Sequence, residues 1–203
     1  MSKKVLRRWS QPIASLTIIG ICAVIFLIEY FIPSLYTYNH LQFRPPVRLD
    51  WLPFTLSPVF LHFTWLHICM NLVMFWFFAR QIEALIGSWC VWGLLIVVGL
   101  VSNIAQFIVS GPAFGGLSGV VMGCVSFVWA GTLHKPQFGF YVPSGLIVFL
   151  LISLVLGFFG VLDFIFGPIA NTAHGVGFLT GFICWPIFYS LKVIFSKLSS
   201  FYR

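Results

Sequence analysis

The chain has 203 residues, of which 60% are hydrophobic and only 7% are charged. A soluble domain carries roughly 25% charged residues, so this composition excludes an ordinary soluble domain and predicts an all-α integral membrane protein. The net charge of +7 comes from basic residues at the ends of apolar segments. That placement is typical of membrane orientation, and we expect no nucleic-acid partner.

Six apolar stretches meet or approach the roughly 20 residues that a spanning helix needs. The first follows a basic N-terminus, but its apolar run is long and no small-x-small cleavage site follows, so we expect a helix and not a signal peptide. We therefore predict a single domain over 1–203 with helices at about 12–33, 65–83, 88–109, 117–133, 144–161 and 171–191.

The lysines and arginines predict the orientation of these helices. If the N-terminus is cytoplasmic, the opposite side receives only Arg44 and Arg48. An even number of spans then also places the C-terminus in the cytoplasm. The cytoplasmic side receives the other nine, which are Lys3, Lys4, Arg7, Arg8, Arg80, Lys135, Lys192, Lys197 and Arg203.

The first connection, about 34–63, is long, rich in aromatic residues and prolines, and poor in charge. This composition does not fit a free polar linker. We expect the segment to pack on, or partly into, the outer leaflet of the membrane.

Polar residues within spans are costly and mark functional sites by default. Ser118 precedes Lys135 by 17 residues and His174 precedes Lys192 by 18, which is roughly 26 and 27 Å along a helix. Both side chains therefore lie at a similar depth, below the outer edge of a hydrocarbon core about 30 Å thick. His67 also lies toward the outer end of its segment.

Glycine spacing predicts contact between the fourth and sixth helices. Such i, i+4 pairs let two helix backbones approach closely, and here they would bring Ser118 and His174 together. The pairs are Gly119 with Gly123 and Gly177 with Gly181.

A serine beside a histidine base is the minimal machinery for acyl transfer. The chain has only four acidic residues and none is well placed beside His174, so we expect a Ser–His dyad. The N–H of Ser118 at a helix N-terminus, with His67 and Asn71 four residues apart on one helix face, could stabilise an oxyanion. Glycines such as Gly116 before the serine would let backbone and substrate approach.

Other chemistries fit the sequence less well. There is no H-E-x-x-H motif and no third ligand for His62 and His67, so we expect no metal. Paired aspartates on facing helices are absent, and the serine does not lie in a strand–turn–helix G-x-S-x-G context. Taken alone, Ser118 would more often be a packing residue; its matched depth with His174 favours function.

The stretches "HICMN", "SGPAFGGLSGVV" and "AHGVGFLTG", in this order, resemble the rhomboid family of intramembrane serine proteases, in the bacterial type without an extra N-terminal cytoplasmic domain. The resemblance covers nearly the whole six-helix core. It implies Ser118 as nucleophile, His174 as general base, and His67, Asn71 and the Ser118 N–H as oxyanion donors. It also implies that the fifth loop and fifth helix gate substrate entry.

Three further positions are judged against this resemblance. Asn171 matches a polar position just before the histidine of the family. Met122 stands where relatives often carry a tyrosine that stacks on that histidine, and a thioether can take this place. Trp51 lacks the arginine that usually follows in the first loop of relatives.

We therefore expect an endopeptidase that cleaves in or near transmembrane segments of other proteins, in the bacterial inner membrane, with its site open toward the periplasm. We expect no cofactor. A catalytically silent rhomboid-like protein that binds membrane clients is the alternative. A small transporter is a third possibility, against which stand the missing sequence repeat and the lack of paired acids.

Overall fold

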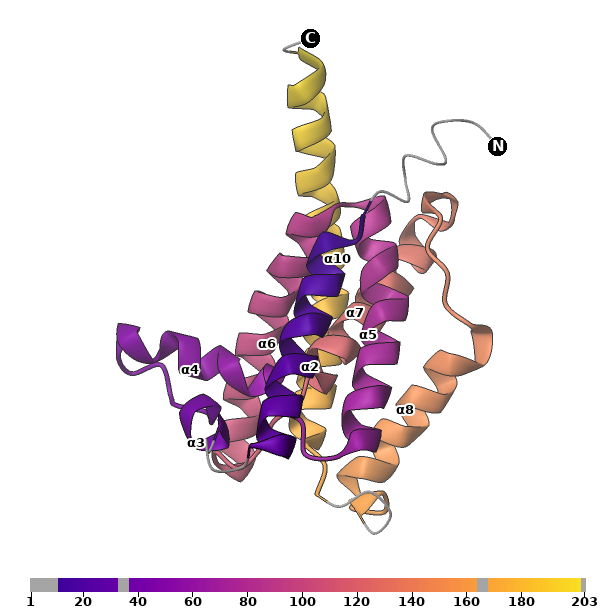
Figure 1. Cartoon of the computed structure of the whole chain (residues 1–203). Helices are drawn as coiled ribbons and strands as arrows, with labels where there is room; N and C mark the ends of the chain where they lie inside the picture. The colour runs from indigo at the N-terminus through magenta and orange to yellow at the C-terminus, as the bar shows by residue number, and fades with distance from the viewer. Residues whose placement is uncertain (1–10, 33–36, 164–167, 202–203) are drawn as a thin grey trace.

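The computed structural model describes residues 11–32, 37–163 and 168–201, and these residues form helices and no strand. Figure 1 shows a bundle of long helices. The long helices are α2 (Ile13–Phe31), α5 (Trp65–Leu85), α6 (Ser88–Ser110), α7 (Ser118–His134), α8 (Ser144–Phe158) and α10 (Asn171–Phe201). Short helical turns are α3 (Thr37–Leu41), Leu49–Trp51, α4 (Leu52–Leu56), Ser57–Phe60 and Pro136–Phe138.

Each of the six expected segments overlaps one of the long helices, and two helices differ from the expectation by three or more residues at their ends. The expected 144–161 helix ends at Phe158, because the chain turns at Gly160 with φ of +71°. The expected 171–191 helix continues to Phe201, since the residues after Lys192 hold no proline or glycine that would stop it.

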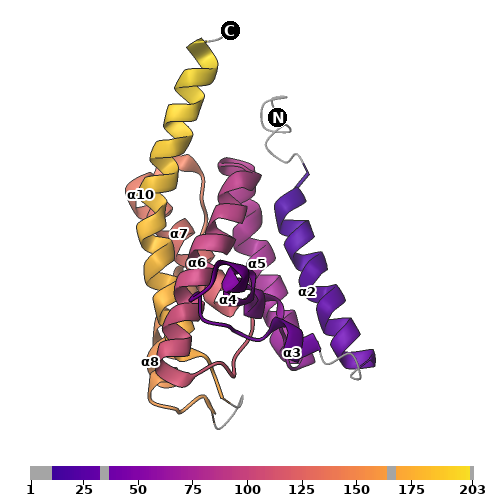
Figure 2. The same ribbon diagram turned by 90° about the vertical axis from the view of Figure 1, so that its left-hand side faces the viewer.

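Within the part of the chain that the structure describes, four helical stretches are long and apolar enough to cross a membrane: α2, α5, α6 and Asn171–Ser196 of α10. Helices α7 and α8 are apolar but shorter, with 17 and 15 residues. Seventeen residues extend about 26 Å, a little less than a hydrocarbon core about 30 Å thick. In this bundle α2 begins and α10 ends at the same end (Figures 1 and 2).

Helix α7 lies at the centre of the bundle. Its residues from Gly119 to Val128 are all buried, as expected for a helix that is apolar on every side. Helices α5, α6 and α10 pack around it. By contrast α8 lies along the outside, where only Ile147 and Gly157 are buried.

Helices α7 and α10 approach each other through the predicted glycines. A Cβ atom added to Gly181 would lie 2.5 Å from the C and Cα atoms of Gly123, and one added to Gly177 would lie 2.9 Å from the C atom of Gly119. Carbon atoms in contact are normally about 3.5–4.0 Å apart. Only glycines allow this backbone separation.

Glu83 of α5 holds the beginning of α2. Its carboxylate accepts hydrogen bonds from Ala14 N (2.7 Å), from Ser15 N (2.9 Å) and Oγ (2.6 Å), and from Ser88 Oγ (2.6 Å). The N-terminal N–H groups of a helix have no intrahelical acceptor, and a negative charge there is favourable. This acidic residue is therefore the cap of a neighbouring helix.

Helix α4 and the turn Ser57–Phe60, in the connection that leads to α5, pack against the side of α6 (Figures 1 and 2). Asn103 of α6 donates to Thr55 O (2.9 Å), and Leu56 fills the space over Gly99. Arg48 lies 6.0 Å from the ring of Trp51 and pairs with Asp50. Residues 52–60 are thus fixed to the bundle. An arginine lies near Trp51 although none follows it directly in sequence.

Candidate active site

The structure brings Ser118 and His174 into direct contact. Ser118 is the first residue of α7 and His174 lies in the first turn of α10. His174 Nε2 lies 2.7 Å from Ser118 Oγ, a hydrogen-bonding distance. A neutral imidazole whose Nε2 is unprotonated accepts from the serine hydroxyl, which is the arrangement that nucleophilic catalysis needs.

The turn before Ser118 depends on Gly116. Its φ is +129°, a conformation that favours glycine. A Cβ there would also lie 2.7 Å from His67 Nε2. The turn therefore places the His67 ring directly beside the residues that lead into the serine.

His67 and Asn71 lie one turn apart at the beginning of α5. Thr64 caps this helix by accepting from His67 N (3.1 Å). Asn71 Nδ2 donates to His67 O (2.9 Å), and a second hydrogen on Nδ2 remains for another acceptor. The Asn71 side chain can thus still donate to a second acceptor.

The remaining expected site residues have packing roles in the structure. Gly119 lies close to Ser102 and to Ala173 O, and Met122 is buried one turn after Ser118. Asn171 Nδ2 donates to Gly157 O (2.8 Å). Asn171 therefore joins α10 to the outer helix α8.

The sequence did not assign two polar residues near the dyad to the site, although His62 was considered there as a metal ligand. Gln106 of α6 is buried, and its Oε1 accepts from Ala173 N (3.0 Å), the residue before His174. His62 is buried, and its Nε2 accepts from Leu117 N (3.4 Å), the residue before Ser118. A polar residue such as Gln106 within an apolar segment could have been recognised from the sequence as a site candidate. The contact between His62 and Leu117 could not, because the two residues are 55 positions apart.

Three acidic residues bind partners other than His174. Glu83 caps α2, Asp50 pairs with Arg48, and Asp163 Oδ1 accepts from Ile169 N (3.2 Å). Among the residues that the structure describes, no group of three or more His, Cys, Asp or Glu side chains could hold a metal ion.

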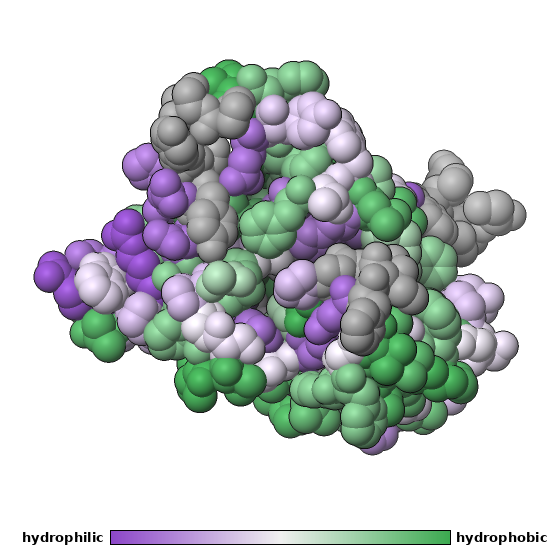
Figure 3. Space-filling model, turned by 90° about the horizontal axis from the view of Figure 1, so that it is seen from below, coloured by the Kyte–Doolittle hydropathy of each residue, from purple (hydrophilic) through white to green (hydrophobic). Residues whose placement is uncertain are grey.

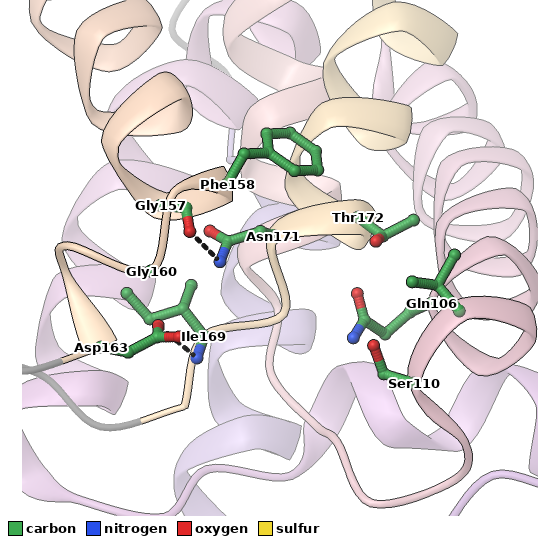
Figure 4. Close-up of a pocket in the computed structure, with 10 residues that line it drawn as sticks. Gln106, Ser110, Gly157, Phe158, Gly160, Asp163, Ile169, Asn171 and Thr172 are labelled. Carbon is green, nitrogen blue, oxygen red and sulfur yellow. Dashed lines mark hydrogen bonds between the residues drawn. The ribbon is translucent and has the colours of Figure 1, made fainter.

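A hollow of about 280 Å³ opens beside the first turn of α10. Figure 4 shows Gln106 and Ser110 on one side of it, and Asn171, Ile169 and Asp163 on the other. Figure 3 looks onto this end of the molecule, where hydrophilic residues gather on the left and in the middle and hydrophobic residues occupy much of the lower margin. The end of the bundle that carries the serine and histidine is thus partly polar within an otherwise apolar exterior.

The fold and this pair define a helical membrane protein with a serine–histidine site at the end of two closely packed helices. A family model for the Rhomboid domain matches residues 50–191, and the chain belongs to the rhomboid family.

Curated relatives agree with this assignment. The chain is 40% identical to Rhomboid protease GlpG of Klebsiella pneumoniae over 125 residues, which is 62% of this chain and 44% of the relative. It is 39% identical to Rhomboid protease GlpG of Serratia proteamaculans over 127 residues, 63% and 45% of the two chains. It is 33% identical to the Rhomboid protease GlpG homolog of Cronobacter sakazakii over 170 residues, 82% and 60% of the two chains. The chain thus matches about half the length of these relatives.

Proposed function

We propose that this protein is an intramembrane serine endopeptidase that hydrolyses peptide bonds in or near transmembrane segments of other membrane proteins. The observation that carries the proposal is the 2.7 Å contact between Ser118 Oγ and His174 Nε2. Membership of the rhomboid family supports it, as does the similarity to proteins named as rhomboid proteases or a homolog of one.

In this mechanism His174 removes the hydroxyl proton while Ser118 Oγ attacks the scissile carbonyl carbon. The carbonyl oxygen becomes an oxyanion, and the Ser118 N–H, His67 and Asn71 donate hydrogen bonds to it. The imidazolium then protonates the leaving amine, and an acyl-enzyme forms. His174 next activates a water molecule that releases the second product and restores the serine.

The proposed site lies below the membrane surface. We infer that six helices cross the bilayer with both termini in the cytoplasm, and that the site opens toward the periplasm of a bacterial inner membrane. The common end of α2 and α10, where Lys192 reaches Leu85 O, supports this orientation. Because α7 spans about 26 Å of a core about 30 Å thick, water must reach Ser118 through a polar opening.

The proposed substrate is a transmembrane segment that unwinds locally. A helix hides its carbonyl groups in hydrogen bonds, so the attacked carbonyl must first be freed. Helix-breaking Gly or Pro near the cleavage site should therefore speed cleavage. A substrate series in which such residues make no difference would contradict this part of the proposal.

The protein purified in detergent would be mixed with a single-span test substrate, and cleavage followed on a gel. The variants would be Ser118→Ala, His174→Ala and, as a matched control in the same helix, Ser126→Ala. Ser126 Oγ donates to Gly123 O within α7, about two turns from Ser118, so this variant should cleave at near the wild-type rate.

Cleavage by the wild type and the control, and by neither dyad variant, is the expected result. Cleavage by Ser118→Ala would exclude it as the nucleophile. If the wild type binds the substrate without cleaving it, and does not react with a fluorophosphonate, the client-binding alternative would replace the protease.

A further inference from the structure

His62 is a buried titratable residue that the proposed mechanism does not use. It lies in the stretch between Ser57–Phe60 and α5, and it is only 1% exposed. Its ring is tilted against the ring of His67, with a centroid distance of 5.0 Å. The His62 ring therefore packs against His67, a proposed oxyanion donor.

Two hydrogen bonds determine the tautomer of His62. Nδ1 lies 3.2 Å from Phe60 O, and since a carbonyl oxygen only accepts, Nδ1 must carry the proton. Nε2 then has a lone pair and accepts from Leu117 N at 3.4 Å. Both contacts are satisfied only by the neutral ring with its proton on Nδ1.

Residues 58–62 hold the turn that leads into the serine. Gly116 N donates to Pro58 O (2.9 Å) and Leu117 N donates to His62 Nε2. A Cβ on Gly115 would lie 2.8 Å from the Cβ of Leu61, so the turn packs tightly on residues 58–62. The next N–H along the chain is that of Ser118. Because adjacent peptide planes share a Cα atom, fixing the Leu117 N–H restricts the direction of the Ser118 N–H.

The surroundings of His62 favour its neutral form. The pKa of His62 is lowered to about 4, mainly by burial and to a smaller extent by the neighbouring His67, while the bond to Phe60 opposes the shift. A protonated ring would direct Nε2–H at Leu117 N–H and lose the acceptor. At neutral pH the ring is thus a fixed acceptor.

Given the proposed function, in which the Ser118 N–H is an oxyanion donor, we propose that His62 is a positioning residue. Its Nε2 accepts from Leu117 N and so aims the Ser118 N–H at the developing oxyanion, while its ring supports His67. His62 touches neither substrate nor the reacting atoms. Its effect belongs to the transition state and appears in kcat with little change in KM.

The test compares His62→Gln with His62→Asn in full-length protein in detergent. A glutamine Oε1 can reach the place of Nε2 and accept from Leu117 N, whereas the shorter asparagine amide ends near the place of Nδ1. Both variants keep a polar side chain in the same space. His134→Asn is the matched control, because His134 is exposed at the far end of α7.

The measurements are kcat and KM for the test substrate, corrected for the folded fraction from thermal unfolding. We expect kcat of His62→Asn to fall roughly 10- to 100-fold, less than or equal to the loss of a whole oxyanion donor, with KM within about twofold. His62→Gln should keep at least about a third of the wild-type kcat, and His134→Asn should match the wild type.

Equal kcat for the asparagine and glutamine variants, whether both high or both low, would overturn the role of the acceptor. A loss in His62→Asn that disappears after correction for unfolded protein would reduce His62 to a structural residue. An inactive wild type would instead refute the proposed function, so the two failures are distinguishable.

Discussion

The close approach of α7 and α10 predicts a large effect from one added methyl group. In Gly181→Ala the new Cβ would lie 2.5 Å from two backbone carbon atoms of Gly123. Backbone atoms have no alternative rotamer, so the two helices must separate. Since carbon atoms need about 3.5 Å, the separation is roughly 1 Å.

Moving the two helices apart would affect both the contact within the dyad and the stability of the protein. Adding about 1 Å to the 2.7 Å between Ser118 Oγ and His174 Nε2 gives about 3.7 Å, which is beyond hydrogen-bonding distance. Misplacement by 1 Å can cost about 100-fold in rate. Overpacking a core costs typically about 1–3 kcal/mol, and the rigid backbone contact places this variant near the upper value.

The assay would follow thermal unfolding by circular dichroism in detergent, and cleavage of the test substrate at a temperature where the variant is folded. Gly175→Ala is the matched control in the same helix, because its Cβ would lie 3.4 Å from the Phe158 side chain, an ordinary contact. It should be neutral, or more stable by up to about 1 kcal/mol through helix propensity. If Gly181→Ala is as stable and active as Gly175→Ala, the reasoning from backbone contact is refuted.

Three further outcomes follow from the hydrogen bonds. Glu83→Gln should lower the free energy of unfolding by about 1–3 kcal/mol, because an amide NH₂ would face the N–H and O–H groups that now donate to the carboxylate. Denaturant titration measures this loss, and kcat should stay unchanged at denaturant concentrations where the variant is folded. A variant as stable as the wild type would contradict the prediction. Asn171→Ala should lower the free energy of unfolding by about 1 kcal/mol, because Asn171 donates to Gly157 O in the last turn of α8. Amide hydrogen exchange should become faster in that turn and stay slow in α7. An equal change of the exchange rate in both helices would contradict this prediction. The pKa of His62 is about 4 in the folded protein and 6.5 in the unfolded chain. Between these pH values the unfolded chain binds more protons, so the free energy of unfolding falls as the pH drops from about 7 toward 4, by up to about 3 kcal/mol. His62→Gln should lack this contribution in unfolding titrations at pH 7 and 5, and identical slopes for the two proteins would contradict it.

Short, regular patterns in the sequence were enough to predict the helical segments and the proximity of Ser118 and His174. Apolar length predicts helices, and glycine spacing predicted which two of them meet. Matched distances from Lys135 and Lys192 then placed the serine and histidine at one depth. Their contact in the structure is what this reasoning requires, while their catalytic roles stay proposals.

The parts that could not be predicted depend on long-range hydrogen bonds. Glu83 caps a helix 68 and 69 positions away, and nothing near it in sequence marks that partner. The hydrogen bond from Leu117 N to His62 depends on how the first loop packs on the bundle. Asn171 was assigned by family position, and its bond to Gly157 depends on where α8 lies.

The central claim is that Ser118 is a nucleophile activated by His174. The most direct measurement is labelling with a fluorophosphonate in detergent at pH 7, followed by peptide mapping in a mass spectrometer. We predict one adduct on Ser118 in the wild type, strong slowing in His174→Ala, and none at this position in Ser118→Ala. No adduct on Ser118 in folded wild-type protein, or equal labelling with and without His174, would contradict the account.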